Sequence, residues 1–525
     1  MPNIHDCLMQ FTRRAERVED EKLVATFVDA APLLASISSY DNQIIYGRRG
    51  TGKTHVIKYL GESKASAGDI TLFIDLRAIG SNGSIYADYN KTIPQRATPL
   101  LLDVLQAMHE ELLTAAIDRS ADFDLSVVGP LLDDLADSIS QVKVVGTVEA
   151  STEDSAKVSH TTRAGLATKI SASDANVGVD IEDSEAAEAA RKTSTMRKGV
   201  EEYYVSFSTV QNHLRKVIDA FKDRRLWVLL DEWSEIPQDI QPYLADLIRR
   251  CIFPIAKITT KITAIEHRTR LLERRAEGYV GIEVGADAGA DVNLDDFMVF
   301  DNDANRSKLF FSNLLFKHYR ASEGLGEDEG PKNANDLIGN LFTQITAFEE
   351  FVRATEGVPR DAVYLASTVA RKAYGRAVSV DDVRAAARDW YQNDKSTALN
   401  SDERIYQLLH WIIEEVIGHR KARAFLLRSN EKHPLIDLLF DARLVHILKR
   451  NVSSHDTPGV RYDVYKLDYG CYVDLITTAK APQGLLPFDD AEVSFVEVPP
   501  DDYRAIRRAI LDITDFEKKL LDSPA

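Results

Sequence analysis

Eight consecutive residues near the start of the chain have the types and spacing that bind phosphate. They fit the pattern G-x-x-x-x-G-K-[ST] and are Gly47, Arg48, Arg49, Gly50, Thr51, Gly52, Lys53 and Thr54. The glycines let consecutive backbone N–H groups face a phosphate, and a following helix adds partial positive charge. We expect Lys53 to reach the β- and γ-phosphates of a nucleotide and the Thr54 hydroxyl to bind Mg²⁺.

The neighbouring residues give this loop the setting that phosphate binding requires. An apolar run at 44–46 predicts a short buried strand, and residues 55–60 have the pattern of a helix. A glycine-rich turn between a strand and a helix is the context in which this pattern holds a nucleotide. The predicted nucleotide-binding segment is therefore 47–54 together with His55 at the helix start.

A second group of residues has the chemistry for hydrolysis. The apolar run at 226–230 predicts a buried strand, and Asp231 and Glu232 follow it directly. At the carboxyl end of the strand Asp231 can hold Mg²⁺ through water, and Glu232 can polarise an attacking water molecule. Two acids after an apolar run are a weak signal alone. Because they follow a phosphate loop, the site is predicted to hydrolyse nucleotide as well as bind it.

Further patterns place these residues in an α/β fold. The segment 70–76 is almost continuously apolar, as strands buried on both faces are, and 258–265 is rich in β-branched residues. Strand, helix and strand in this order imply right-handed crossovers and hence a parallel sheet of the P-loop NTPase type. Amphipathic periodicity over 98–140 and a helical segment at 209–222 supply helices to cover it.

Composition excludes several classes of protein. The 525 residues exceed what one hydrophobic core usually serves, so several domains are expected. A net charge of −18 opposes nonspecific attraction to nucleic acid, so bound DNA would have to meet a local basic patch. Three cysteines without metal-type spacing predict a reduced, cytoplasmic protein. No signal-peptide pattern and no long apolar run appear, so a membrane location is not expected.

The stretch from about 142 to 205 interrupts the α/β pattern and is predicted to be an insertion. It is dominated by small, polar and acidic residues, and it offers little apolar area to offset the entropy of ordering. Alternating pieces at 142–144 and 168–171 could pair as a thin β-arm. A β-arm and a disordered insertion both remain open.

A third specific feature, the sequence G-V-P-R that ends at Arg360, lies in the helical region 303–394. With the phosphate loop and the Asp-Glu strand, it resembles AAA+ ATPases of the origin-recognition-complex-like (ORC-like) initiator clade, which adjoins the STAND ATPases. We identify the chain as a bacterial-type member of that clade. The resemblance implies ATP or ADP and Mg²⁺ as ligands and a helical lid whose arginine, Arg360, reaches the nucleotide. A lid cation at the γ-phosphate makes closure depend on which nucleotide is bound.

The resemblance also suggests where the γ-phosphate is sensed. In additional-strand P-loop ATPases a polar side chain at the end of the next strand has this role, which makes Glu266 and His267 candidates. A solvated strand end is the alternative for both. Nearby arginines are candidates for a finger that reaches a neighbouring subunit, or simply pair with surface acids: Arg249, Arg250, Arg268, Arg270, Arg274 and Arg275.

The sequence predicts that the chain has four parts. An N-terminal helical segment (1–40) precedes the AAA+ core (41–300), which contains the insertion, and a helical lid (301–398) and a winged-helix-like domain (399–525) follow.

The winged-helix-like domain is predicted from helices at 403–428 and 435–450 and a hairpin wing at 460–476. A last amphipathic helix is expected over 503–521. Basic residues that could contact DNA phosphates are Arg420, Lys421, Arg423, Arg443, Lys449, Arg450 and Arg461. Acidic residues are interleaved with them, so a protein-interaction module is the alternative.

Two classes of function remain open at this point. The first is an ATPase that switches between ATP- and ADP-bound forms while it acts on or near duplex DNA, bound through 400–470. The second is a regulatory ATPase that assembles on ATP and signals to a partner effector protein, as in bacterial anti-phage defence. A homo-oligomer is expected in both cases.

Overall fold

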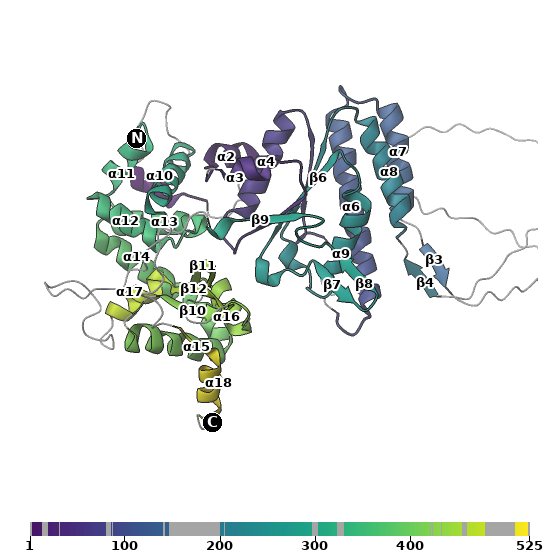
Figure 1. Cartoon of the computed structure of the whole chain (residues 1–525). Coiled ribbons are helices and arrows are strands. Elements are labelled where there is room, and N and C mark those ends of the chain that lie inside the picture. The colour runs from purple at the N-terminus through teal and green to yellow at the C-terminus, as the bar shows by residue number, and fades with distance from the viewer. Residues whose placement is uncertain are drawn as a thin grey trace, which may run out of the picture. The chain divides into compact units, whose positions relative to one another are not determined.

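The structure is a computed structural model of the chain (Figure 1). It describes all residues except 1–2, 13–18, 31, 80–85, 87, 140–141, 146–199, 204, 297–302, 323–329, 421, 423, 432, 454–458, 478–509 and 523–525. The chain divides into two compact units, Met1–Ile139 with Ser206–Ala525, and Ser140–Val205.

A five-stranded parallel sheet lies in the larger unit. In spatial order its strands are β2 (Ile70–Asp75), β5 (Leu226–Asp231), β6 (Ile258–Ala264), β1 (Gln43–Tyr46) and β9 (Gly289–Asn293). Every residue of β5 and β6 is buried, as expected for strands covered on both faces. Because β6 separates β1 from β5, the phosphate loop and the Asp-Glu pair follow strands that flank β6 at one sheet edge. The predicted parallel α/β fold is confirmed.

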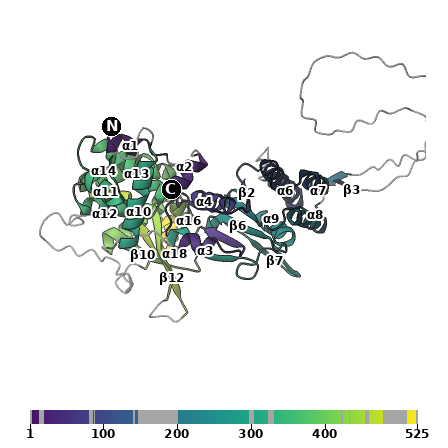
Figure 2. The same cartoon turned by 90° about the horizontal axis from the view of Figure 1, so that it is seen from above.

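Helices pack against both the sheet and each other. They are α4 (Lys53–Ser66), α6 (Ile93–Asp118), α7 (Leu125–Ile139), α8 (Phe207–Ala220) and α9 (Gln241–Leu247), and a π-turn extends α9 to Ile252. Helix α4 contacts β2, β5 and β6, whereas α6, α7 and α8 lie side by side (Figures 1 and 2). In the described part of the chain no helix combines the length and apolarity that crossing a membrane requires.

Five helices follow the sheet in sequence and form the helical region predicted as a lid. They are α10 (Ala304–Arg320), α11 (Ala334–Leu341), α12 (Ile345–Ala354), α13 (Pro359–Lys372) and α14 (Val380–Asn393). The side chains of Asp303 and Ser379 accept backbone N–H bonds at the starts of α10 and α14, which fixes where these helices begin.

The N-terminal segment connects this helical region to the sheet. It contains α1 (Ile4–Met9), α2 (Asp20–Thr26) and α3 (Leu33–Ile37). Helix α1 packs on α13 and α10, whereas α3 contacts α4 and β9. Cys7 and Leu8 of α1 are almost fully buried in the same apolar core as the lid helices.

The smaller unit contains a two-stranded antiparallel ladder, β3 (Val142–Val145) with β4 (Val200–Tyr203). The first piece of the predicted arm is therefore a strand, but its partner is β4. The other proposed piece, 168–171, lies outside the described residues.

The C-terminal part contains a small antiparallel sheet. Its strands are, in order, β10 (Ala424–Arg428), β12 (Arg461–Leu467) and β11 (Val445–Ser453). The helices are α15 (Glu403–Ile413), α16 (Pro434–Asp441), α17 (Tyr469–Thr477) and α18 (Ile513–Asp522). Helix, strand, helix and hairpin in this order form the predicted winged-helix-like fold, with one helix between the first two strands of the sequence.

The two helices predicted here were too long. Helix α15 ends at Ile413 and continues as a π-turn to His419, and residues 424–428 form a strand. Helix α16 ends at Asp441, and β11 begins at Val445. The run Ala-Phe-Leu-Leu of β10 is buried at every position, and a short continuous apolar run has no periodicity that separates a strand from a buried helix.

The wing was also assigned to the wrong pair of segments. Strand β12 pairs with β11, whereas residues 471–476, predicted as the second wing strand, lie in helix α17 (Tyr469–Thr477). This helix packs on α14 of the lid. The final helix spans Ile513–Asp522, and residues 503–509 of the predicted 503–521 lie outside the described part.

Candidate nucleotide-binding site

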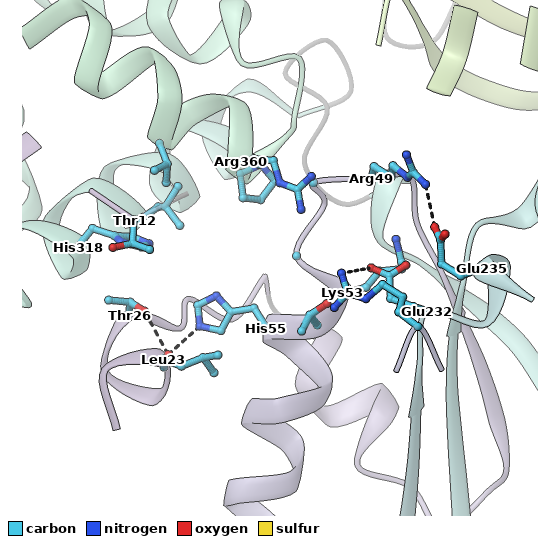
Figure 3. A pocket seen from close by; sticks show the side chains of 17 residues that line it. Thr12, Leu23, Thr26, Arg49, Lys53, His55, Glu232, Glu235, His318 and Arg360 are labelled. Carbon is cyan, nitrogen blue, oxygen red and sulfur yellow. Dashed lines mark hydrogen bonds and ion pairs between the residues drawn. The ribbon is translucent and has the colours of Figure 1, made fainter. Parts of the chain in front are cut away.

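A cavity of about 360 Å³ brings the phosphate loop, the Asp-Glu strand and the lid together (Figure 3). It is lined by Thr12, Leu23, Thr26, Arg49, Gly50, Gly52, Lys53, Thr54, His55, Arg77, Glu232, Glu235, Leu314, His318, Pro359, Arg360 and Val363. These residues come from seven separate segments of the chain. The fold therefore assembles a polar end, with cations and carboxylates, and a less polar end near Leu23 and Leu314.

The phosphate loop adopts a backbone that its glycines make possible. Gly50 and Gly52 both have φ of 94°, in the left-handed region that side chains disfavour. A Cβ on Gly50 would also lie 3.1 Å from the Cβ of Arg360. The backbone N–H of Arg360 donates to the Gly50 carbonyl at 3.2 Å, so the loop and the start of α13 are in direct contact.

Lys53 is folded back onto its own loop. Its ammonium group donates to the carbonyls of Gly47 at 2.8 Å and Arg48 at 3.2 Å. Burial lowers the pKa of this ammonium, while the nearby carboxylates of Glu232 and Asp231 act in the opposite direction. A buried cation whose hydrogen bonds to the described residues go to two carbonyls is suited to exchange them for an anionic phosphate.

Asp231 is fully buried at the end of β5. One carboxylate oxygen accepts a hydrogen bond from the hydroxyl of Thr263 on β6, and the other, Oδ2, has no hydrogen-bond partner among the described residues. A buried carboxylate oxygen without a partner is costly, so it fits a role in holding a hydrated cation. No cluster of three or more His, Cys, Asp or Glu side chains arranged for a metal occurs in the described residues.

Glu232 has an unusual backbone conformation. Its φ of 57° lies in the left-handed region, and its N–H donates to the Thr263 hydroxyl at 3.3 Å. Its carboxylate lines the cavity 3.8 Å from a guanidinium nitrogen of Arg77. Burial raises the pKa of Glu232, and the charge of Lys53 offsets part of this rise. A raised carboxyl pKa makes its carboxylate a stronger base.

A second, smaller hollow adjoins the first and shares Gly52, His55, Leu314 and Pro359 with it. Its other lining side chains are mostly apolar: Phe27, Val28, Ala30, Leu33, Thr51, Val56, Leu294 and Phe310. Such a lining next to a phosphate loop suits the flat, weakly polar base of a nucleotide.

Sequence comparison bears on the same part of the chain. The model of the ORC-CDC6-like family matches residues 11–67, which run from the N-terminal segment through the phosphate loop and α4. This segment is ORC-CDC6-like. The predicted resemblance to the ORC-like clade is therefore confirmed, whereas a bacterial origin is not supported.

Two further comparisons concern solved structures and curated proteins. Among solved structures, the chain is similar to the Orc1 protein of Aeropyrum pernix in complex with DNA, at 12% identity and a TM-score of 0.31. That match covers 89% of this chain and 95% of the other. A search of curated proteins gives no match.

Most of the predicted site residues do meet at the cavity. Those that line it are Arg49, Gly50, Gly52, Lys53, Thr54, His55, Glu232 and Arg360. Gly47, Arg48 and Thr51 lie in the same loop but behind its surface, and Arg48 and Thr51 are buried. Asp231 is buried directly before Glu232.

The structure does not bring Glu266 and His267 into this cavity. Glu266 forms an ion pair with Arg450 at 2.5 Å, and His267 lies 3.0 Å from the carboxylate of Asp441. Both partners belong to the C-terminal part of the chain. The end of β6 therefore points toward the C-terminal part of the chain. The β6 side chain that contacts Asp231 and Glu232 is Thr263.

Several residues in or beside the cavity carried no recognisable sequence signal. Arg77 follows β2, and because carboxyl ends of parallel strands share an edge, its place could have been inferred from the fold. Thr263 looks like any β-branched strand residue. Thr12, which follows α1, and His318 of α10 reach the cavity only through tertiary packing.

The arginines considered as fingers all have acidic neighbours within the chain. Arg249 and Arg250 pair with Asp246, and Arg268 pairs with Asp441. The remaining three lie within 4.0 Å of Glu273 or Glu283: Arg270, Arg274 and Arg275. Any finger role would require one of these pairs to open.

The basic residues predicted to face DNA are also engaged within the chain. Arg443 pairs with Asp361 and Arg450 with Glu266, whereas Arg420 and Arg461 donate to backbone carbonyls. Lys449 has interactions as well. Lys421 and Arg423 lie outside the described residues.

Protonation of His318 is expected to weaken the lid. Burial lowers the pKa of this imidazole from 6.5 to about 3, with smaller contributions from His55 and Lys22. Between these values the unfolded chain binds a proton that the folded chain does not, so stability falls as pH falls below 6.5. When the pH is lowered from 7.5 to 5.5, the free energy of unfolding should fall by about 1.4 kcal/mol less in His318→Gln than in wild type. Denaturant unfolding at the two pH values measures the difference.

The exposed His410 provides the matched control. Its side chain is half exposed beside Glu414, and His410→Gln should keep the wild-type pH dependence. If His318→Gln showed the same pH dependence as wild type, the imidazole would not be held neutral.

Proposed function

We propose that this chain is an AAA+ ATPase that binds ATP with Mg²⁺ and hydrolyses it to ADP and phosphate. The observation that carries the proposal is that Lys53, Glu232 and Arg360 line one cavity although they are distant in sequence. A phosphate-binding cation, a carboxylate with a raised pKa and a lid cation are the groups that hydrolysis of a nucleotide triphosphate needs. A simple phosphate-binding turn would need only the first.

Each group has a distinct role in the proposed reaction. The loop N–H groups and Lys53 hold the β- and γ-phosphates, and Thr54 and Asp231 would hold Mg²⁺, Asp231 through water. When bound, Mg²⁺ would neutralise phosphate charge. The unpartnered Oδ2 of Asp231 supports this assignment.

Glu232 acts as the general base. It takes a proton from a water molecule, and the oxygen of that water forms a new bond to the γ-phosphorus. The bond from the γ-phosphorus to the bridging oxygen breaks at the same time, and the bridging oxygen leaves with ADP. Arg360 supplies positive charge to the γ-phosphate from the lid. Because Arg360 lies in the first turn of α13 while Lys53 is the first residue of α4, the bound triphosphate would join the lid to the sheet.

The proposed output is a nucleotide-dependent switch, in a homo-oligomer, that acts on or near duplex DNA through residues 400–470. The winged-helix-like order of α15, β10, α16, β11 and β12 supports this assignment. The cytoplasmic location stays a prediction from composition. The domain limits at 40, 300 and 398 are likewise proposed.

One observation favours the second candidate, a regulatory ATPase that controls a partner protein. Arg443 and Arg450, which DNA binding would use, pair with carboxylates of the same chain. A second observation is that α16 is the one helix among the described residues between β10 and β11, whereas a helix-turn-helix arrangement uses two.

The two candidates are separated by measuring ATP turnover and duplex DNA binding together. An ATPase that acts on DNA should bind a duplex with an affinity that falls steeply between 50 and 200 mM salt, by roughly 10³-fold or more for six phosphate contacts. Wild type with ATP, wild type with ADP and a chain ending at residue 398 would be compared. Absence of ATP binding would overturn the proposal, and ATP-driven assembly without DNA binding would support the regulatory candidate.

A further inference from the structure

Arg48 of the phosphate loop connects three parts of the chain. Its Nε lies 2.8 Å from the carboxylate of Asp295, just after β9, and one terminal nitrogen donates to the Glu356 carbonyl in the lid at 2.8 Å. The other terminal nitrogen hydrogen-bonds to Nδ1 of His446 on β11. Arg48 is 3% exposed, so these contacts are shielded from water.

The contact with His446 has a defined direction. An arginine can only donate, so Nδ1 of His446 accepts, and the ring proton must sit on Nε2. Nε2 lies 3.2 Å from the carboxylate of Asp468, which in turn pairs with Lys395 at 2.5 Å. Burial keeps the pKa of His446 well below its usual range, with a further contribution from Arg48. The neutral ring therefore links the loop to a buried charge cluster.

That cluster leads back to the lid. Lys395 also lies 3.3 Å from Asp361, which neighbours Arg360 and pairs with Arg443. The residues that face His446 thus come from the phosphate loop, the lid, the segment before α15 and the small sheet. A parallel contact joins Glu356 of the lid to Lys466 of β12 at 2.8 Å, and both side chains are buried.

A ligand in the phosphate loop would change the hydrogen bonds to the backbone of Arg48. In the described arrangement Lys53 donates to the Arg48 carbonyl, as does the Thr51 hydroxyl at 2.9 Å. A phosphate that draws Lys53 away removes one of these bonds from the residue whose side chain contacts His446. Resting on the proposed function, we propose that the Arg48–His446 contact transmits occupancy of the phosphate loop to the C-terminal part of the chain.

Hydrogen exchange of α16 tests this coupling, because α16 lies beside β11 and its Phe440 ring is 5.4 Å from the Arg48 guanidinium. The experiment uses full-length Glu232→Gln protein with and without saturating ATP and Mg²⁺, so that nucleotide persists. ATP is expected to change the exchange rate of residues 434–441 about fivefold or more. Adding His446→Leu should abolish the change. His446→Gln, whose amide oxygen can accept from Arg48, should retain part of it.

Two controls separate coupling from simple loss of packing. The exposed His410→Leu should keep the full response. The double variant Glu356→Gln with Lys466→Met removes the parallel ion pair without leaving a buried unpaired charge, and it should also keep the response. If the double variant and His446→Leu lost the response equally, general docking and not Arg48 would be responsible.

The outcomes also separate this inference from the proposed function. If calorimetry detected no ATP binding, the proposed function would fail. If ATP bound but exchange of 434–441 were unchanged, or if His446→Leu responded like its parent, only the coupling through Arg48 would be refuted.

Discussion

Glu232→Gln is expected to leave ATP binding within a few-fold of wild type and to reduce turnover by roughly 10²- to 10⁴-fold, the usual contribution of a general base. The substitution preserves size and leaves the left-handed backbone at φ of 57° as it is. It removes the one property that the reaction step needs, which is the ability of the side chain to accept a proton from water. Calorimetric ATP titration and phosphate release measure the two quantities separately.

The wild-type pH profile adds a second test of the same role. Because burial raises the pKa of Glu232, the carboxylate is lost at a higher pH than for an ordinary glutamate, and turnover should fall as pH falls through that raised value. Glu283→Gln is the control, since the Glu283 side chain is 41% exposed, lies outside the cavity and pairs with Arg274 at 3.4 Å. Wild-type turnover in Glu232→Gln would exclude Glu232 as the base.

Lys53→Ala is expected to weaken ATP binding by roughly 30- to 5,000-fold, which corresponds to about 2–5 kcal/mol for loss of one partner of a buried charge contact. Lys53 is 6% exposed and begins α4 directly behind the loop. Without Lys53, the bound phosphates would lose the ammonium group whose charge offsets the cost of burying them. Titration with a fluorescent ATP analogue measures the loss.

A lysine on the same helix provides the control for this variant. Lys58 lies over the ring of Phe73 at 5.2 Å and does not line the cavity, so Lys58→Ala should bind ATP like wild type. Circular dichroism of both variants verifies the fold. Unchanged affinity in Lys53→Ala would mean that the cavity does not hold the triphosphate at this loop.

The sequence predicted the sheet and the polar end of the cavity because both depend on local patterns. Strands such as β5 are uniformly apolar, and the phosphate loop is constrained by backbone geometry at Gly50 and Gly52. Once β1 and β5 belong to one parallel sheet, the loop after β1 and Glu232 after β5 must approach each other. Chain connectivity alone therefore determined that part of the site.

The remaining features depend on tertiary contacts that no local pattern encodes. Glu266 and His267 were sensible sensor candidates by position, but carboxylate and cation partners in the C-terminal part, Asp441 and Arg450, engage them instead. Residues 471–476 of helix α17 were predicted as a strand because they follow the alternating segment 460–469 after a bend at Gly470. Packing against α14 decided its conformation.

The position of α1 has a mechanical consequence for the helical lid. Helix α1 packs on α13 and α10, whereas α2 and α3 contact α4 beside the sheet, so helices of one short segment touch both parts. We therefore expect any movement of the lid helices relative to the sheet to displace these N-terminal helices as well.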